Sequence, residues 1–192
     1  VCGDDTSGYS AVYLIRPQVP APAENADIIY ILDTADSSAS SQNVAKAALT
    51  EFLRNMNRYS HFFISTINGE IYSNEFLAPT LTNIAKVEEW LGNLDSFVQI
   101  GEKAYKDAIQ KVFDISNGAQ IIFITASGLL CRYHNLQNMI IKNVYKSGQA
   151  FGSAVQHVGK SQTTFNIVSI GSGIHNGFYE KFSSECLGIF GQ

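Results

Sequence analysis

Long apolar runs and clusters of positive charge are both missing from this sequence of 192 residues. The longest apolar stretches, such as residues 121–124, end well short of the roughly 20 residues that cross a bilayer. Thirteen Lys and Arg against seventeen Asp and Glu give a formal net charge of -4. Binding to nucleic acid requires a basic surface that neutralises phosphates, so we expect neither a nucleic-acid partner nor insertion into a membrane.

Cysteine is scarce, and its three positions are Cys2, Cys131 and Cys186. The termini of compact domains commonly lie close together, so we expect a disulfide between Cys2 and Cys186. Such a bond predicts an oxidising, extracellular location for a secreted chain. The alternative is three unpaired thiols in a reducing compartment, and the odd number of cysteines keeps that alternative open.

The chain also lacks close histidine pairs and the Gly-x-Ser-x-Gly turn of serine hydrolases,. Ser127 with His134 is a weak candidate for a nucleophile and its base. Cys131 beside Arg132 is a weak candidate for a reactive thiol, and a buried structural cysteine is the better interpretation. We therefore expect no enzymatic activity.

Short apolar runs that alternate with amphipathic stretches are the main pattern of the chain. Three of the four prolines fall within residues 1–25 (Pro17, Pro20 and Pro22), which predicts an extended N-terminal arm,. Residues 26–192 are predicted to form a single α/β domain. We expect a doubly wound, mostly parallel open sheet with helices on both faces.

Nearly continuous apolar runs predict buried strands at residues 27–33, 120–125 and 165–170,. Asn68-Gly69, between residues 61–67 and 70–76, is a strong hairpin signal and predicts one antiparallel edge strand. Apolar residues at helical spacing predict a first helix with its N-cap at Ser40 or Ser41 and then two further helices. These three sets are Val44, Ala47, Ala48, Phe52 and Met56; Ile84, Val87, Trp90, Leu91 and Leu94; and Ala104, Ala108, Ile109 and Val112. Further helices are predicted at residues 136–145, 153–158 and 178–187.

The loops that follow Asp33 and Thr125, and the one around Gly101, are predicted to meet at one edge of the sheet. Ligands of open α/β sheets bind at the carboxyl ends of the strands. A nucleotide-binding turn needs glycines there, yet the first loop, DTADSSAS, contains none,. We therefore expect a binding edge that does not bind nucleotides.

These segments, in this order, resemble the von Willebrand factor A family, also called the integrin inserted-domain family, over residues 27–190. The resemblance rests on the strand ending in Asp33, the Ser-rich loop, the hairpin, GEKAYKDAI from Gly101, QIIFITASG from Gln120, and a late strand followed by Gly171. It implies an α/β domain that binds partner proteins.

The family pattern includes a metal-ion-dependent adhesion site, in which an Asp-x-Ser-x-Ser loop, a Thr and a second Asp hold Mg²⁺ through oxygen atoms. Asp33 and Ser37 match this pattern. Ala35, Lys103 and Ala126 stand at the other three positions, and none of them offers a suitable oxygen. The resemblance therefore implies a degenerate site with no bound metal and no other cofactor.

Two alternatives concern this degenerate site. In the first, the Lys103 ammonium pairs with Asp33 in place of the ion, and Lys103→Ala costs about 3–5 kcal/mol of stability; otherwise Lys103 points into solvent. In the second, a shifted register with Asp36, Ser38 and Ser40 spells Asp-x-Ser-x-Ser and makes the domain a metal-dependent adhesion receptor.

The function expected from the resemblance is an extracellular protein-binding, adhesion or scaffolding module that acts without a bound metal. Its partner would be an extracellular or matrix protein. The residues expected to contact the partner lie in the loops at the carboxyl edge of the sheet: Thr34, Asp36, Ser38, Lys103, Ser127, Arg132 and Tyr133.

Overall fold

The computed structural model describes residues 26–33, 35, 38–94, 100–149, 163–171 and 175–192. They form one parallel sheet of five strands in the order β2-β1-β3-β4-β5. The strands are β1 (Asp27–Asp33), β2 (His61–Thr66), β3 (Gln120–Thr125), β4 (Thr164–Ser169) and β5 (Phe190–Gly191). The arm predicted at residues 1–25 and the helix predicted at 153–158 lie outside the described residues.

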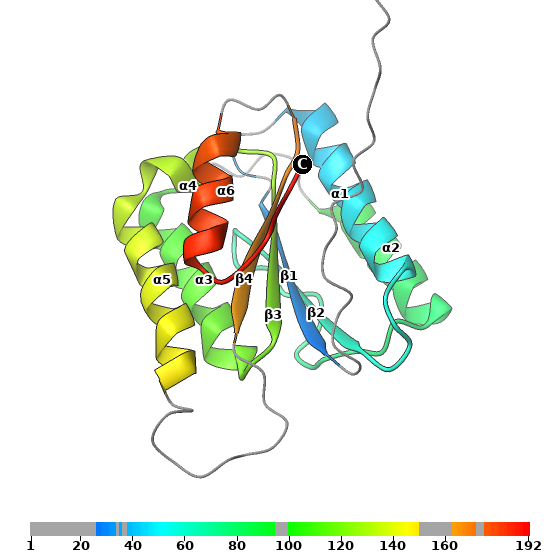
Figure 1. The fold of residues 1–192 in the computed structure, drawn as a ribbon. Coiled ribbons are helices and arrows are strands. Elements are labelled where there is room, and N and C mark those ends of the chain that lie inside the picture. The colour runs from blue at the N-terminus through cyan, green and yellow to red at the C-terminus, as the bar shows by residue number, and fades with distance from the viewer. Residues whose placement is uncertain (1–25, 34, 36–37, 95–99, 150–162, 172–174) are drawn as a thin grey trace, which may run out of the picture.

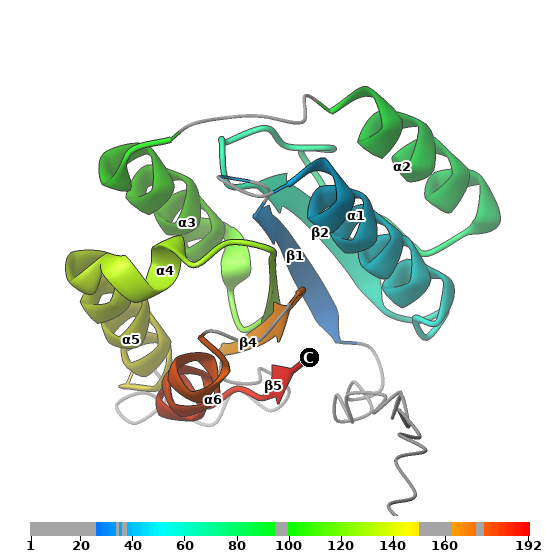
Figure 2. The same cartoon turned by 90° about the horizontal axis from the view of Figure 1, so that it is seen from above.

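Six helices of the described chain cover both faces of this sheet (Figure 1). One face carries α1 (Ala39–Arg54) and α2 (Leu81–Asn93), and the other carries α3 (Glu102–Ser116), α4 (Leu129–Arg132), α5 (His134–Gln149) and α6 (Asn176–Glu185). Figure 2 shows the same three layers from above. The predicted doubly wound α/β architecture is confirmed. Within the described residues, every helix is too short or too polar to span a membrane.

The central strands are apolar along their whole length because both of their faces are buried. In β1, Ile29 and Ile31 pack into the cluster on the side of α3, α5 and α6. Ile28, Tyr30 and Leu32 pack into the cluster on the side of α1 and α2. A strand between two helical layers has no solvent face, so polar residues do not alternate along it.

The hairpin turn after β2 forms as predicted, but a continuous antiparallel strand does not follow it. Gly69 takes the positive φ of 88° that this tight turn requires,. Residues 70–77, hereafter the return segment, then meet β2 at two isolated antiparallel bridges, Ser65–Ile71 and Phe62–Leu77. Between the bridges the segment leaves the sheet edge at a local turn, in which the Glu75 amide donates to Ser73 Oγ (3.3 Å).

Helix α1 forms where predicted but turns a different stripe toward the sheet. Val44 is 53% exposed, and the buried residues are Gln42, Ala45, Leu49 and Leu53. Both stripes are spaced like one face of a helix, so spacing alone did not separate them. The N-cap is Ser38, whose side chain accepts a hydrogen bond from the Ser41 amide, and neither Ser40 nor Ser41 has this role.

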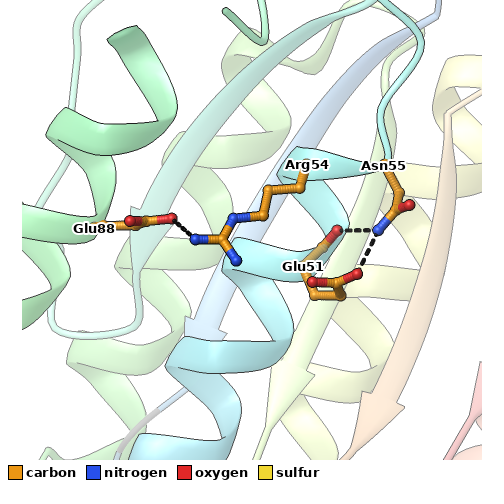
Figure 3. Close-up of polar contacts among 4 residues, drawn as sticks. All are labelled: Glu51, Arg54, Asn55 and Glu88. Atoms are coloured by element: carbon orange, nitrogen blue, oxygen red, sulfur yellow. Dashed lines mark hydrogen bonds and ion pairs between the residues drawn. The ribbon is translucent and has the colours of Figure 1, made fainter. Parts of the chain in front are cut away.

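Arg54 at the end of α1 pairs with Glu88 of α2 at 2.6 Å (Figure 3). Asn55 closes the same end of α1, since its Nδ2 donates to the Glu51 carbonyl (2.8 Å) and to Glu51 Oε1 (2.7 Å). Both side chains of the ion pair are more than a third exposed, so the pair contributes at most about 1 kcal/mol,. The packing of α1 against α2 therefore depends mainly on their apolar faces.

The strand order places a topological switch point between β1 and β3. From β1 the chain moves to the β2 edge, then crosses back and continues through β3 to β5. Helices therefore leave these two neighbouring strands toward opposite faces, which opens a crevice at their carboxyl ends. Asp33 and Thr125 are register partners at this point.

Candidate functional site

Asp33 ends β1 at the switch point, and its side chain is fully buried. Three hydroxyl groups donate to its Oδ2 atom: Tyr105 at 2.5 Å, Thr125 at 2.7 Å and Ser127 at 2.8 Å. The Ala35 amide donates to Oδ1 at 3.1 Å. The donors come from three chain segments, so this carboxylate ties together the ends of β1 and β3 and the first turns of α3.

The fold positions each hydroxyl donor through ordinary secondary structure. Thr125 is opposite Asp33 in the parallel ladder, and Ser127 follows it by two residues. Tyr179 of α6 donates to the Ser127 carbonyl at 2.6 Å and so holds that turn in place. The Tyr105 ring is fully buried and contacts Tyr133 edge-on, with ring centroids 5.8 Å apart.

Burial raises the pKa of Asp33 above its ordinary value, and its hydrogen bonds to Tyr105, Thr125 and Ser127 act in the opposite direction. The pKa of Tyr105 is raised well above its ordinary value, first by burial and then by the nearby Asp33 charge. Tyr105 therefore keeps its proton and acts as a donor. A buried carboxylate without donors would be far more costly, so the hydroxyl groups stabilise Asp33 in the interior.

The described residues around Asp33 offer a poor fit to Mg²⁺. Three hydroxyl groups already donate to Oδ2 and the Ala35 amide donates to Oδ1, so an ion at Oδ2 would have to displace these donors,. Ala35 and Ala126 bring no side-chain oxygen, and Asp33 is not accessible to solvent. Within the described residues, His, Cys, Asp and Glu side chains do not gather into a group of three or more that could hold a metal ion.

Of the two alternatives for Lys103, the structure shows the second, in which its side chain is exposed to solvent, and not the pairing with Asp33. Lys103 is exposed on the first turn of α3, and none of the ion pairs among the described residues includes it. Tyr105, two residues further along, turns inward and supplies the contact instead. A neutral hydroxyl donor satisfies the buried carboxylate without bringing a second charge into the interior,.

The other predicted contact residues lie at the carboxyl edge in different degrees of exposure. Lys103, Arg132 and Ser38 are exposed, while Ser127 and Tyr133 are half-buried. Ser38 caps α1 and lies 2.9 Å from Ser40 Oγ, so both serines of the shifted register are engaged locally. Thr34, Asp36 and Ser37 lie outside the described residues.

The structure gives no support to the predicted disulfide between Cys2 and Cys186. Cys186 follows α6 as a free thiol buried in the core, and burial raises its pKa to about 12. Cys2 lies outside the described residues. Cys131 is a half-buried free thiol whose pKa is also raised by burial.

The structure does not bring the weak enzymatic candidates together. Ser127 Oγ donates to Asp33, whereas His134 is exposed and lies 3.3 Å from Gln137 Oε1. A Ser-His-Asp arrangement requires the histidine between the other two groups. Here serine and aspartate are in direct contact.

Tyr105 is the site residue that the sequence interpretation missed. The third predicted helix was assigned a core face that included Ala104, yet Ala104 is exposed and Tyr105 is fully buried. The available signal was the spacing of Tyr105, Ile109 and Val112, which places all three on one helical face. The comparison with the family's metal-ligand pattern instead suggested Lys103 as the residue that contacts Asp33, whereas Tyr105 makes this contact.

Comparisons with solved structures show the class of fold. A von Willebrand factor type A structure from Catenulispora acidiphila matches with a TM-score of 0.64 and 15% identity, over 88% of this chain and 38% of that chain. An aerotolerance-related membrane protein from Bacteroides fragilis matches with a TM-score of 0.53 and 11% identity, over 88% and 91% of the two chains. The VWA domain of SpRpn10 matches with a TM-score of 0.52 and 11% identity, over 87% of each chain.

Neither a protein-family model nor a curated protein matches the sequence. The structural matches nevertheless confirm the resemblance in its fold. The chain has a von Willebrand factor A-like α/β fold.

Proposed function

We propose that this domain is a non-enzymatic protein-binding or adhesion module that engages its partner without a bound metal. The proposal depends on one observation, which is that the Asp33 side chain is fully buried. In a metal-dependent adhesion site, the ion must reach this aspartate and keep one position open for a carboxylate of the partner. Here the same carboxylate is buried beneath a layer of hydroxyl donors.

Two exposed cations lie on helices that follow the carboxyl edge of the sheet. Lys103 is in the first turn of α3 and Arg132 ends α4. Neither takes part in an ion pair among the described residues. A partner carboxylate can pair with either cation directly, and an arginine offers it two parallel hydrogen bonds. We propose that these two cations bind the carboxylate of the partner in place of a metal ion.

A titration with Mg²⁺, Mn²⁺ and Ca²⁺ followed by calorimetry tests the metal-independent part of the proposal. We expect no heat of binding at micromolar affinity for any of the three ions. A clear micromolar site would favour the alternative, a metal-dependent adhesion domain using Asp36, Ser38 and Ser40. A von Willebrand factor A domain with all five ligands serves as the positive control.

Capture of partners from an extracellular matrix extract tests the binding surface. The wild type should retain the same proteins with and without a chelator, and the Lys103→Glu/Arg132→Glu variant should lose them. Lys86→Glu, an exposed cation of α2 on the opposite face, is the matched control and should behave like the wild type. Capture that depends on the divalent ion, or that ignores both charge reversals, would overturn the proposal. An extracellular site of action is also part of the proposal; it is supported by the resemblance to adhesion domains and not by the cysteines, because Cys186 is a free thiol in the structure.

A further inference from the structure

Asn68 and Gly69 form the turn between β2 and the return segment, and this dipeptide has a reactivity of its own besides its shape. The sequence contains three such dipeptides: Asn68-Gly69, Asn117-Gly118 and Asn176-Gly177. Glycine has no side chain beside its nitrogen, so this backbone nitrogen meets no steric barrier when it approaches the carboxamide of the preceding asparagine. Asparagine before glycine can therefore lose its amide without an enzyme.

The loss of the Asn68 amide consumes one water molecule and releases ammonia. The Gly69 nitrogen gives its proton to hydroxide and forms a bond to Asn68 Cγ. The bond between Cγ and Nδ2 then breaks, and Nδ2 takes a proton from water and leaves as ammonia. Water opens the resulting cyclic imide at one of its two carbonyl groups. The product is an aspartyl residue, or an isoaspartyl residue in which the main chain runs through Cβ and Cγ.

The folded turn holds both reacting groups in other contacts. The Gly69 amide donates its proton to the Thr66 carbonyl at 3.0 Å. Asn68 Oδ1 accepts a hydrogen bond from Thr66 Oγ1, and Asn68 Nδ2 donates to Glu70 Oε1 at 2.8 Å. Thr66 is itself only 3% exposed, so one side of this arrangement is anchored in the interior. These contacts of Thr66 and Glu70 with Asn68 and Gly69, hereafter the turn clamp, oppose the attack of the nitrogen on Cγ.

Loss of the amide would place two carboxylates side by side in this turn. Glu70 Oε1 now accepts from Asn68 Nδ2, and after the reaction it would face a negatively charged oxygen at the same position,. The bonds that follow the turn hold the return segment to β2: the Thr66 amide donates to the Glu70 carbonyl at 2.8 Å, and the Tyr72 amide donates to the Ile64 carbonyl at 3.1 Å. Repulsion within the turn therefore weakens the attachment of the return segment.

We propose that Asn68 is a site of spontaneous deamidation that the turn clamp protects in the folded protein, and that its reaction detaches the return segment from β2. The reaction requires a local opening of the turn, so its rate is reduced by the small population of the open state. Each reaction adds one negative charge to the chain and is not reversed by refolding. This chemistry depends on neither a partner nor a metal ion, so it is separate from the proposed function.

The two other Asn-Gly dipeptides provide internal standards for a test. Asn117 is exposed at the end of α3, and Asn176 is the half-buried first residue of α6. In an unfolded chain these differences in environment are largely lost, so all three asparagines should react at rates within about threefold of one another. The ratio of the rates in the folded and unfolded chains then measures the protection at each position.

Peptide mapping by mass spectrometry, after incubation of the full chain at mildly alkaline pH, measures these rates. We expect Asn68 to react at least about tenfold more slowly in native buffer than in urea. Equal rates in the two solvents would overturn the proposed protection, whatever the result at Asn117 and Asn176.

Two variants test whether the turn clamp is the cause of the protection. Glu70→Ala removes the acceptor of Asn68 Nδ2, and Thr66→Val removes the hydroxyl group that donates to Asn68 Oδ1. Each should raise the rate at Asn68 in native buffer at least about threefold and leave the rates at Asn117 and Asn176 within about twofold of the wild type. Thermal unfolding verifies that each variant is folded. Glu70 is exposed, so Glu70→Ala decides the test if Thr66→Val fails to fold. An unchanged rate at Asn68 in a folded variant would overturn the role of the clamp.

Hydrogen exchange followed by mass spectrometry tests the effect on the return segment. In Asn68→Asp, which reproduces the aspartyl product, the amides of residues 70–77 should exchange at least about tenfold faster than in the wild type. The double variant Asn68→Asp/Glu70→Ala lacks the second carboxylate and should exchange more slowly than Asn68→Asp alone. Asn117→Asp is the matched control and should leave the exchange of residues 70–77 unchanged. Wild-type exchange rates in Asn68→Asp would overturn the proposed detachment.

Discussion

The hydroxyl group of Tyr105 donates a 2.5 Å hydrogen bond to Asp33 Oδ2, and 72 positions of the chain separate the two residues. The bond joins the first turn of α3 to the end of β1. It therefore helps to hold these two elements together at the carboxyl edge of the sheet.

Replacing Tyr105 by Phe should measure the contribution of this hydrogen bond. The change leaves the ring packing intact and removes one donor from a fully buried carboxylate. We expect the free energy of unfolding to fall by about 1.5–3 kcal/mol, measured by urea denaturation. Tyr133→Phe is the matched control, because Tyr133 contacts the Tyr105 ring and its hydroxyl has no hydrogen bond within the described part of the chain. Equal losses in the two variants would contradict the assigned role.

Lys103→Ala should leave stability almost unchanged. The side chain is exposed and forms no ion pair among the described residues, so its removal breaks no structural contact. We expect a change within about 0.5 kcal/mol, measured as the melting temperature of the variant against the wild type. A loss of several kcal/mol would revive the pairing of Lys103 with Asp33.

Stability should also depend on pH through Asp33. Its folded pKa is raised by burial, so the folded state binds a proton more readily than the unfolded chain does,. The stabilisation linked to Asp33 is thus complete below the unfolded pKa, near 3.8, and is lost as the pH rises through the folded pKa. Asp33→Asn cannot titrate at this position. The free energy of unfolding of the wild type minus that of Asp33→Asn should therefore decrease from about pH 4 upward, and a difference that grows with pH would contradict the sign.

Gly188 is predicted to be irreplaceable by alanine, whereas Gly92 is not. A Cβ atom at Gly188 would lie 2.0 Å from the Phe165 carbonyl oxygen, and backbone atoms cannot move aside cheaply. Gly188→Ala should cost at least about 1–3 kcal/mol in urea denaturation. Gly92 is exposed near the end of α2 with open space around it, so Gly92→Ala should leave stability unchanged or raise it by up to about 1 kcal/mol,.

The rate of labelling with iodoacetamide distinguishes Cys131 from Cys186 and tests the predicted disulfide between Cys2 and Cys186. In the folded protein we expect Cys131 to react at least about tenfold faster than Cys186, because Cys186 is buried and its pKa is about 12,. In denaturant without a reductant, Cys186 should become reactive, since the structure has it as a free thiol. A Cys186 that stays unreactive until a reductant is added would restore the disulfide with Cys2.

The sheet and the position of the site could be predicted because each depends on a local pattern with one physical meaning. In residues 27–33 and 120–125, the side chains that point to either face of the strand are mostly apolar. A strand between two helical layers requires this pattern,. The ends of neighbouring parallel strands meet at one edge, so Asp33 and Thr125 had to be close once both strands were recognised.

The sequence did not determine which face of α1 packs against the sheet, or which residue contacts Asp33. In α1, the stripe containing Val44 and the stripe containing Leu49 are both apolar, and only packing against the sheet decides which one is buried. The family pattern pointed to position 103, whereas in the structure Tyr105, two residues later, donates the hydrogen bond to Asp33. A long side chain from a neighbouring turn can reach a site that the motif assigns to another residue.

The two ends of the sheet have a consequence for the behaviour of this domain at high concentration. On one side β5 is only two residues long, and on the other the return segment shields β2 at its two bridges. An edge strand with free backbone groups is the usual starting point for fibrils and for exchange of strands between copies. Among the described residues both borders of the sheet are therefore partly covered, which reduces the backbone available for such growth.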